Sequence, residues 1–125
     1  AKFIYDLCES STQKQIYFDV FGESLRDFLA ITYHCDALIG NEGGAVNMAK
    51  ALNVPTFTIF SPWIKKEAWS LFEDDKKNVS VHLNDFKTEF FEGKSTKELK
   101  ANWKSLYEKF LPEYFTNKLK QFIKQ

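Results

Sequence analysis

Residues that bind metals or carry redox chemistry are scarce in this sequence, which has two cysteines, two histidines and one methionine among 125 residues. Cys8 and Cys35 lack the spacing of metal ligands, and we expect reduced core residues rather than a disulfide. No group of His, Cys, Asp and Glu has the spacing of a metal site. The sequence therefore predicts neither a metal nor another cofactor.

Net charge is also lacking, because 17 basic residues balance 17 acidic ones. A protein that binds nucleic acid by neutralising phosphates needs a basic excess, so no nucleic-acid partner is expected. No apolar run approaches the roughly 18 residues of a membrane-spanning helix, and no signal-peptide pattern is present. The predicted location is cytoplasmic, with a peripheral position at the inner face of the membrane as a narrower alternative.

Two catalytic motifs are missing as well. There is no Gly-x-x-x-x-Gly-Lys-Ser/Thr loop and no Gly-x-Ser-x-Gly elbow, so P-loop hydrolysis and serine esterase chemistry have no support.

Glycine and proline are few, at five and three, but several of them fall in one stretch, residues 36–62. Residues 37–39 form an apolar run that is too short for a helix, and Gly43-Gly44 supply a turn. A helix follows and ends before Pro55, after which residues 56–60 are rich in β-formers. This order predicts a βαβ unit.

The glycine turn of that unit is the best candidate for a binding site. In open parallel sheets, ligands bind at the carboxyl ends of the strands, and a helix N-terminus there favours an anion such as a phosphate. Glu42 lies at the mouth of the turn, where a carboxylate can accept hydrogen bonds from sugar hydroxyls. The alternative is that Glu42 merely caps the helix.

Upstream of this unit, residues 1–9 suggest a helix tail followed by a loop at residues 10–12. Gln15 to Phe21 is rich in Tyr, Phe, Val and Ile, which predicts a buried strand. Ser24 and Asp27 then resemble a capping box, which predicts a helix from Ser24 to about His34.

Downstream, residues 78–83 alternate as a short strand does. Ser95 and Glu98 form a capping box for a helix that Pro112 interrupts, and a second helix follows. Two placements stay open for these terminal helices: against their own sheet, or across to a partner domain. Aromatic residues make up 17% of the chain, with 13 Phe, and most of them are expected in the core.

Outside the turn, two histidines and two lysines are the further candidates for a role in catalysis or binding. His34 is rejected as a general base because it ends a helix on the far edge of the sheet, where its charge suits the helix dipole. His82 is not expected to be catalytic. Lys65 and Lys66 follow a strand and border the same cleft, where they could contact a diphosphate or simply form a solvated helix start.

Three segments together resemble glycosyltransferase family 9, the lipopolysaccharide heptosyltransferases. They are Phe21-Gly22-Glu23-Ser24-Leu25, residues 36–44 ending in Asn41-Glu42-Gly43-Gly44, and residues 54–62, which begin Val54-Pro55-Thr56 and end Ser61-Pro62. In that family a Gly-x-x-Ser-Leu segment opens a helix, a strand ends in Asn-Asp-Ser/Thr-Gly-Pro-x-His, and the next strand reads Val-Pro-Thr before Gly-Pro. About forty residues carry the match.

The resemblance implies a set of donor-binding residues. Glu42 lies where the family has its donor-binding Asp, Gly43 where it has Ser or Thr, and Gly44 on its glycine. Asn47 occupies the place of the family's His, Asn41 matches its Asn, and Glu23 lies near the position of the donor's base. Ala45 and Ser61 replace a Pro and a Gly. These departures remove a hydroxyl and an imidazole from the pocket, so the identity of the donor stays open.

The resemblance also implies the fold and the reaction. The expected architecture is α/β, with a Rossmann-like parallel sheet of about four strands and flanking helices, as in the C-terminal half of a GT-B glycosyltransferase. Residues 1–125 would be a single donor-binding domain of a longer chain, since the sequence starts at Ala1 and the family has two domains. The expected activity is metal-independent transfer of a sugar from a nucleotide-sugar, with ADP-heptose as the candidate, to a lipopolysaccharide or other glycan acceptor. The base would come from the N-terminal partner domain, so the chain alone should be inactive.

Two rival predictions remain. A UDP-N-acetylglucosamine 2-epimerase-like fold also carries an acid-Ser-Gly-Gly turn, although Val54-Pro55-Thr56 and Ser61-Pro62 favour the transferase. A catalytically silent flavodoxin-like interaction module is the other, and failure to bind nucleotide would distinguish it.

Overall fold

The computed structural model describes residues 2–124 and has a parallel β-sheet at its centre. Its strands are β1 (Leu38–Asn41), β2 (Thr56–Ile59) and β3 (Asn78–Val81), in the spatial order β1-β2-β3. Leu38 lies opposite Thr56, which in turn lies opposite Asn78. The two strands of the βαβ unit and the strand expected at residues 78–83 are thereby confirmed.

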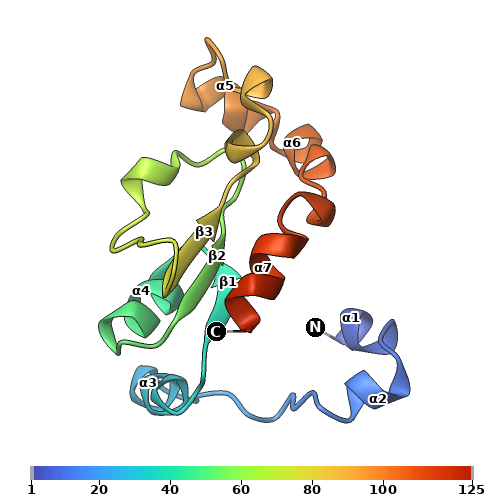
Figure 1. Cartoon of the computed structure of the whole chain (residues 1–125), viewed down its shortest axis with the longest axis vertical. Helices are drawn as coiled ribbons and strands as arrows, with labels where there is room; N and C mark the ends of the chain where they lie inside the picture. Colours follow the sequence, from blue (N-terminus) through green and yellow to red (C-terminus); the bar gives the residue numbers. More distant parts are fainter. Residues whose placement is uncertain (1, 125) are drawn as a thin grey trace.

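Helices cover both faces of the sheet, with α4 (Gly44–Ala51) on one side and α7 (Thr116–Ile123) on the other (Figure 1). Successive side chains of a strand point to opposite faces. Phe57 of β2 packs with Phe115 and Phe122, and the ring centroids of Phe57 and Phe122 are 5.5 Å apart. The alternate residues are small, as Thr58 illustrates, which lets α4 approach the other face closely.

Beyond the carboxyl ends of the strands lie α5 (Thr96–Ala101) and α6 (Trp103–Lys109) (Figure 1). They enclose a second apolar cluster that includes Leu83, Leu99 and Leu106. The predicted capping box is confirmed, because Ser95 Oγ accepts the Glu98 N–H and Glu98 Oε2 accepts the Ser95 N–H, at 3.3 and 2.8 Å. Short 3-10 helices complete this half of the molecule: η1 (Lys66–Ala68), η2 (Leu83–Asp85), η3 (Thr88–Phe90) and η4 (Pro112–Tyr114).

Before the sheet, α3 (Leu25–Tyr33) begins and ends as predicted. Ser24 Oγ accepts the Asp27 N–H at 3.1 Å, and His34 is the C-cap. The first two helices, α1 (Lys2–Asp6) and α2 (Ser10–Gln13), stand apart from the sheet and are joined to α3 by a long extended segment (Figure 1).

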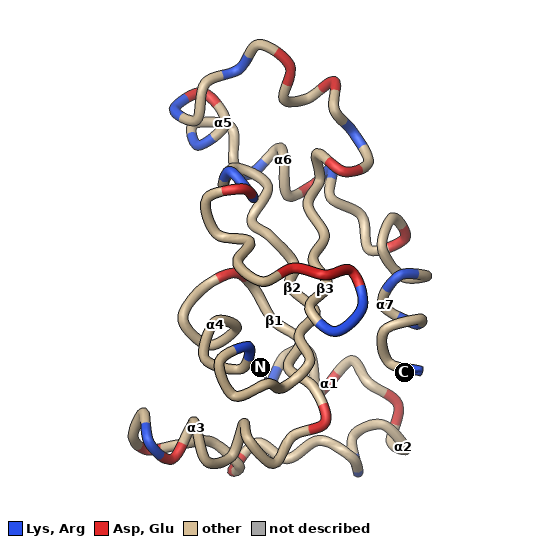
Figure 2. Tube along the Cα trace, turned by 60° about the vertical axis from the view of Figure 1, so that its left-hand side comes forward, with Lys and Arg blue, Asp and Glu red and all other residues tan. Residues whose placement is uncertain are grey.

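The connection between β2 and β3 contains a run of three acidic residues followed by two lysines, which Figure 2 shows beside β3. Each acid has a partner. Glu73 pairs with Lys50 at 2.7 Å, and Asp75 pairs with Lys118 at 3.0 Å. The Asp74 carboxylate accepts the Asn78 N–H at 2.7 Å. The expected polar turn is present, and it also anchors α4 through a lysine whose side chain is only 3% exposed.

The prediction of a strand from Gln15 to Phe21 is wrong. These residues carry no ladder hydrogen bonds, and their apolar side chains are exposed, including Tyr17 and Phe21. The sheet of the described residues therefore has three strands instead of the expected four or so. A strand pattern describes a segment that suits a pleated, half-buried surface, and here no neighbouring strand provides that surface.

Three smaller expectations also need correction. The loop expected at residues 10–12 is part of α2. Cys8 and Cys35 are free, as expected, but Cys35 is exposed and Cys8 only half-buried, so they are not core residues. Fewer Phe side chains than expected are fully buried: Phe57, Phe60, Phe115 and Phe122 are, whereas Phe90, Phe91 and Phe110 are half-buried against the two apolar clusters. Of the two placements left open for the terminal helices, α7 takes the one against its own sheet.

Candidate functional site

The end of β1 is tied to the end of β2 by two side chains. Asn41 donates its Nδ2 hydrogen to the Ile59 carbonyl at 3.1 Å. Glu42 Oε2 accepts the backbone N–H of Ser61 at 2.8 Å. Because both strands are parallel, their carboxyl ends meet at this edge, where ligands of open α/β sheets bind. Glu42 is half-buried, and within residues 2–124 its Oε1 makes no hydrogen bond.

The glycine turn after Glu42 has a conformation that only glycine adopts readily. Gly43 is the N-cap of α4, with φ 146° and ψ −166°. A Cβ on Gly43 would meet no atom within 4 Å, so the backbone angle, not lack of space, requires glycine there. No side chain caps α4, and Asn47 makes the first helical bond by donating its N–H to the Gly43 carbonyl at 3.2 Å. The first amides of α4, from Gly44 on, therefore remain available to an anion.

Glu42 does not cap α4, which was the alternative role considered for it. Its hydrogen bond goes instead to β2's exit, so the carboxylate joins two strand ends. This bond fixes one carboxylate oxygen, and the other makes no hydrogen bond within residues 2–124.

The structure adds an aromatic residue that the sequence did not identify. Tyr107 of α6 donates its hydroxyl hydrogen to Ser61 Oγ at 2.8 Å, next to the Ser61 N–H that Glu42 binds. Its ring meets that of Trp103 edge-on, with centroids 6.0 Å apart. Tyr107 is 46 residues from Ser61 in the sequence. No local sequence pattern could have placed it here, because the contact joins residues so far apart in the chain.

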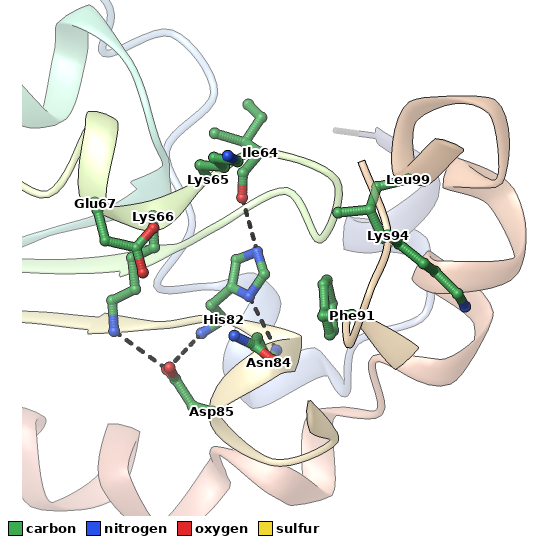
Figure 3. A pocket seen from close by; sticks show the side chains of 10 residues that line it. All are labelled: Ile64, Lys65, Lys66, Glu67, His82, Asn84, Asp85, Phe91, Lys94 and Leu99. Carbon is green, nitrogen blue, oxygen red and sulfur yellow. Dashed lines mark hydrogen bonds and ion pairs between the residues drawn. The ribbon is translucent and has the colours of Figure 1, made fainter. Parts of the chain in front are cut away.

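The two lysines expected at the diphosphate line a different hollow (Figure 3). Lys66 Nζ forms an ion pair with Asp85 at 3.2 Å, whereas Lys65 is exposed. The hollow has a volume of about 260 Å³ and lies between the exits of β2 and β3. Both lysines are at the carboxyl edge of the sheet, but on a neighbouring part of it rather than at the glycine turn.

His82 forms the floor of that hollow and is 4% exposed. Its Nδ1 accepts the Asn84 N–H at 2.9 Å, while Nε2 lies 3.0 Å from the Ile64 carbonyl oxygen. A carbonyl can only accept, so Nε2 carries the hydrogen and the ring is neutral. Burial lowers the pKa of His82, and the nearby Asp85 carboxylate partly opposes this. A ring with both nitrogens occupied has no free position from which to take a substrate proton.

Glu23 is the predicted site residue with the least structural support. It is exposed, and the strand predicted just before it, from Gln15 to Phe21, does not form. It precedes the N-cap of α3, where an acidic residue suits the helix dipole. The structure thus brings Asn41, Glu42, Gly43, Gly44 and Asn47 together around one turn and adds Ser61 and Tyr107, but not Glu23.

The architecture defines a small α/β protein with a three-stranded parallel sheet and flanking helices, compatible with a Rossmann-like fold. Comparison with models of known families, with curated proteins and with solved structures returned no match. Among residues 2–124, no helix is long and apolar enough to cross a membrane. In the same range, no three His, Cys, Asp or Glu side chains gather in the way that a metal ion requires.

Proposed function

We propose that this chain is the donor-binding part of a glycosyltransferase and that the turn from Glu42 to Asn47 holds a nucleotide-sugar. The observation that carries the proposal is the hydrogen bond from the Ser61 N–H to Glu42 Oε2. It orients a carboxylate at the carboxyl edge of a parallel sheet, beside a helix N-terminus that has no side-chain cap. An anionic diphosphate and a hydroxyl-bearing sugar match these two features.

The roles of the groups follow from their chemistry. The amides at the start of α4 would face the phosphates, because their N–H groups lack helical partners and lie at the positive end of the helix dipole. The free Oε1 of Glu42 would accept hydrogen bonds from hydroxyls of the sugar or ribose, and bonds to a charged acceptor are the stronger ones. Gly43 keeps side-chain atoms away from this approach. The resemblance to heptosyltransferases suggests ADP-heptose as the donor and a lipopolysaccharide core as the acceptor.

Titration of the 125-residue chain with ADP, UDP and GDP, followed by heteronuclear NMR, tests the site. The amide signals of residues 42–47 should shift at millimolar nucleotide, because half of a two-domain cleft binds weakly. If no nucleotide shifts them, the site assignment is wrong.

The substitution Glu42→Gln separates the ligand role from the structural one. The amide oxygen of Gln can still accept the Ser61 N–H, so folding should change little. Loss of the charged acceptor should weaken nucleotide-sugar binding by about 1.5–3 kcal/mol, or roughly 10- to 150-fold. An unchanged affinity would remove Glu42 from the site.

Catalysis by this chain alone is not expected. Transfer requires a base and an acceptor hydroxyl held close to the donor, and a second domain would supply both while excluding water. The chain mixed with donor and acceptor should therefore give no more transfer than buffer. Turnover that a substitution within residues 2–124 abolishes would place the catalytic centre here instead.

An interaction module is the second candidate, and the exposed apolar side chains near the N-terminus favour it. Phe3, Leu7, Tyr17 and Phe21 are each more than two-thirds exposed. Large exposed apolar surfaces commonly mark a docking region. A chain that binds no nucleotide but associates with a partner through these residues would support this candidate.

A further inference from the structure

Helix α6 presents two aromatic rings at the carboxyl edge of the sheet. Trp103 and Tyr107 are four residues apart, so they lie on the same side of the helix. They are 46% and 41% exposed, whereas Leu106 is buried in the apolar cluster beneath. The helix therefore directs one side to the core and offers the surfaces of two rings to solvent.

The rings and the glycine turn border the same surface. Tyr107 binds Ser61 Oγ, and Glu42 binds the Ser61 N–H, so one residue and two hydrogen bonds separate the aromatic pair from the carboxylate. The Tyr107 hydroxyl is thereby anchored, which fixes the direction of its ring. Such anchoring is what a preformed binding surface needs, because little side-chain entropy remains to be lost when a ligand arrives.

The geometry of the pair suits a flat ring. The planes of Trp103 and Tyr107 meet at 84°, so the edge of one ring points at the other, and both rings keep part of their surface exposed. Lys104, an exposed residue, places its Nζ over the Trp103 ring, 5.6 Å from the centroid, and adds a cation to this surface. Any nucleobase can stack on an aromatic side chain, since every base has a π-face.

We propose that Trp103 and Tyr107 form a subsite for the base of a nucleotide whose phosphates lie at the glycine turn. The inference rests on the proposed function and names the part of the ligand that α6 recognises. A purine has a larger face than a pyrimidine, so ADP and GDP should bind more tightly than UDP. The difference should be only a few-fold, because stacking discriminates weakly among bases. The sugar is then recognised by Glu42 and not by the subsite that binds the base.

The test compares ADP with inorganic pyrophosphate, which has the phosphates but no base. In the wild-type chain, both ligands should shift the amides of residues 42–47, and ADP should also quench tryptophan fluorescence. Trp103→Ala should weaken ADP binding about tenfold and leave pyrophosphate binding unchanged. Trp103→Phe retains a ring and should restore most of the affinity for ADP. The matched control is Trp69→Ala, since Trp69 is similarly exposed but lies outside the site; it should change neither affinity.

Each outcome decides between the two proposals. If ADP shifts the 42–47 amides and Trp103→Ala does not alter its affinity, the base subsite is wrong while the proposed function stands. If Trp103→Ala weakens ADP and pyrophosphate equally, the residue acts on the fold and the subsite is also wrong. If the wild-type chain binds neither ligand, the proposed function and the subsite are both refuted.

Discussion

Two segments of this chain have the composition of a β-strand, but only one of them forms a strand. Residues 15–21 and residues 78–81 are both rich in β-branched or aromatic side chains. The second forms β3, with Val79 and Val81 buried against β2 and α7, whereas the first is irregular and exposed. The difference lies in their neighbours: β3 has a paired strand on one side and a covering helix. Strand propensity therefore becomes structure only where a partner edge and an apolar layer are supplied.

The largest effect that tests this comparison is the loss of a core ring. Phe57→Ala should reduce the free energy of unfolding by about 4 kcal/mol, because it removes a fully buried side chain between Phe115 and Phe122 and leaves a cavity. Phe21→Ala is the matched control. Its ring is 69% exposed, so the change should stay within about 0.5 kcal/mol. Urea denaturation measures both, and equal costs would show that residues 15–21 pack against the body.

The next effect concerns two ion pairs that differ in burial. Lys50 is nearly inaccessible and binds both Glu73 and the Leu71 carbonyl, while the Lys2–Asp6 pair is exposed. Lys50→Met should cost about 3 kcal/mol, since it leaves the Glu73 carboxylate half-buried with neither oxygen paired. Lys2→Met should have no measurable effect on the unfolding transition. A small loss for Lys50→Met would mean that water reaches Glu73 and replaces the lysine.

Features that depend on adjacent residues were predictable from the sequence. The Ser24 and Ser95 caps, the glycine turn and the βαβ unit all follow from spacings of a few residues. Features that depend on distant residues were not. Glu42 was expected near a ligand, yet nothing local indicated its bond to Ser61, and the approach of Tyr107 to Ser61 joins residues far apart in the chain. Lys65 and Lys66 were expected at the carboxyl edge of the sheet, and they lie there, around a hollow beside the glycine turn whose position depends on the packing of a loop.

A smaller effect tests a feature that depends on adjacent residues, the N-cap of α5. Ser95→Ala removes the side-chain oxygen that accepts the Glu98 N–H at the start of α5, and should cost about 1 kcal/mol. Ser10→Ala, in the exposed helix α2, has no such cap to lose and serves as the control. Thermal unfolding should show a lower Tm for the first variant alone. Equal values of Tm would mean that α5 frays without affecting the cluster formed by Leu83, Leu99 and Leu106.

The smallest expected effect is a pH dependence of stability that comes from His82. The pKa of its ring is lowered in the folded chain, mainly by burial, so the unfolded chain binds a proton more readily. The contribution of His82 to the free energy of unfolding is then fully present above the unfolded pKa of about 6.5. It is lost as the pH drops from there toward the folded pKa. With half a proton bound in the unfolded chain at pH 6.5, the slope is about 0.7 kcal/mol per pH unit. Protonation of Nδ1 would also break its bond to the Asn84 N–H. His82→Gln removes the titrating ring, so the difference in unfolding free energy between wild type and variant should depend on pH between pH 5 and 7. A constant difference across that range would show that His82 keeps an ordinary pKa and that the hollow above it is open to water.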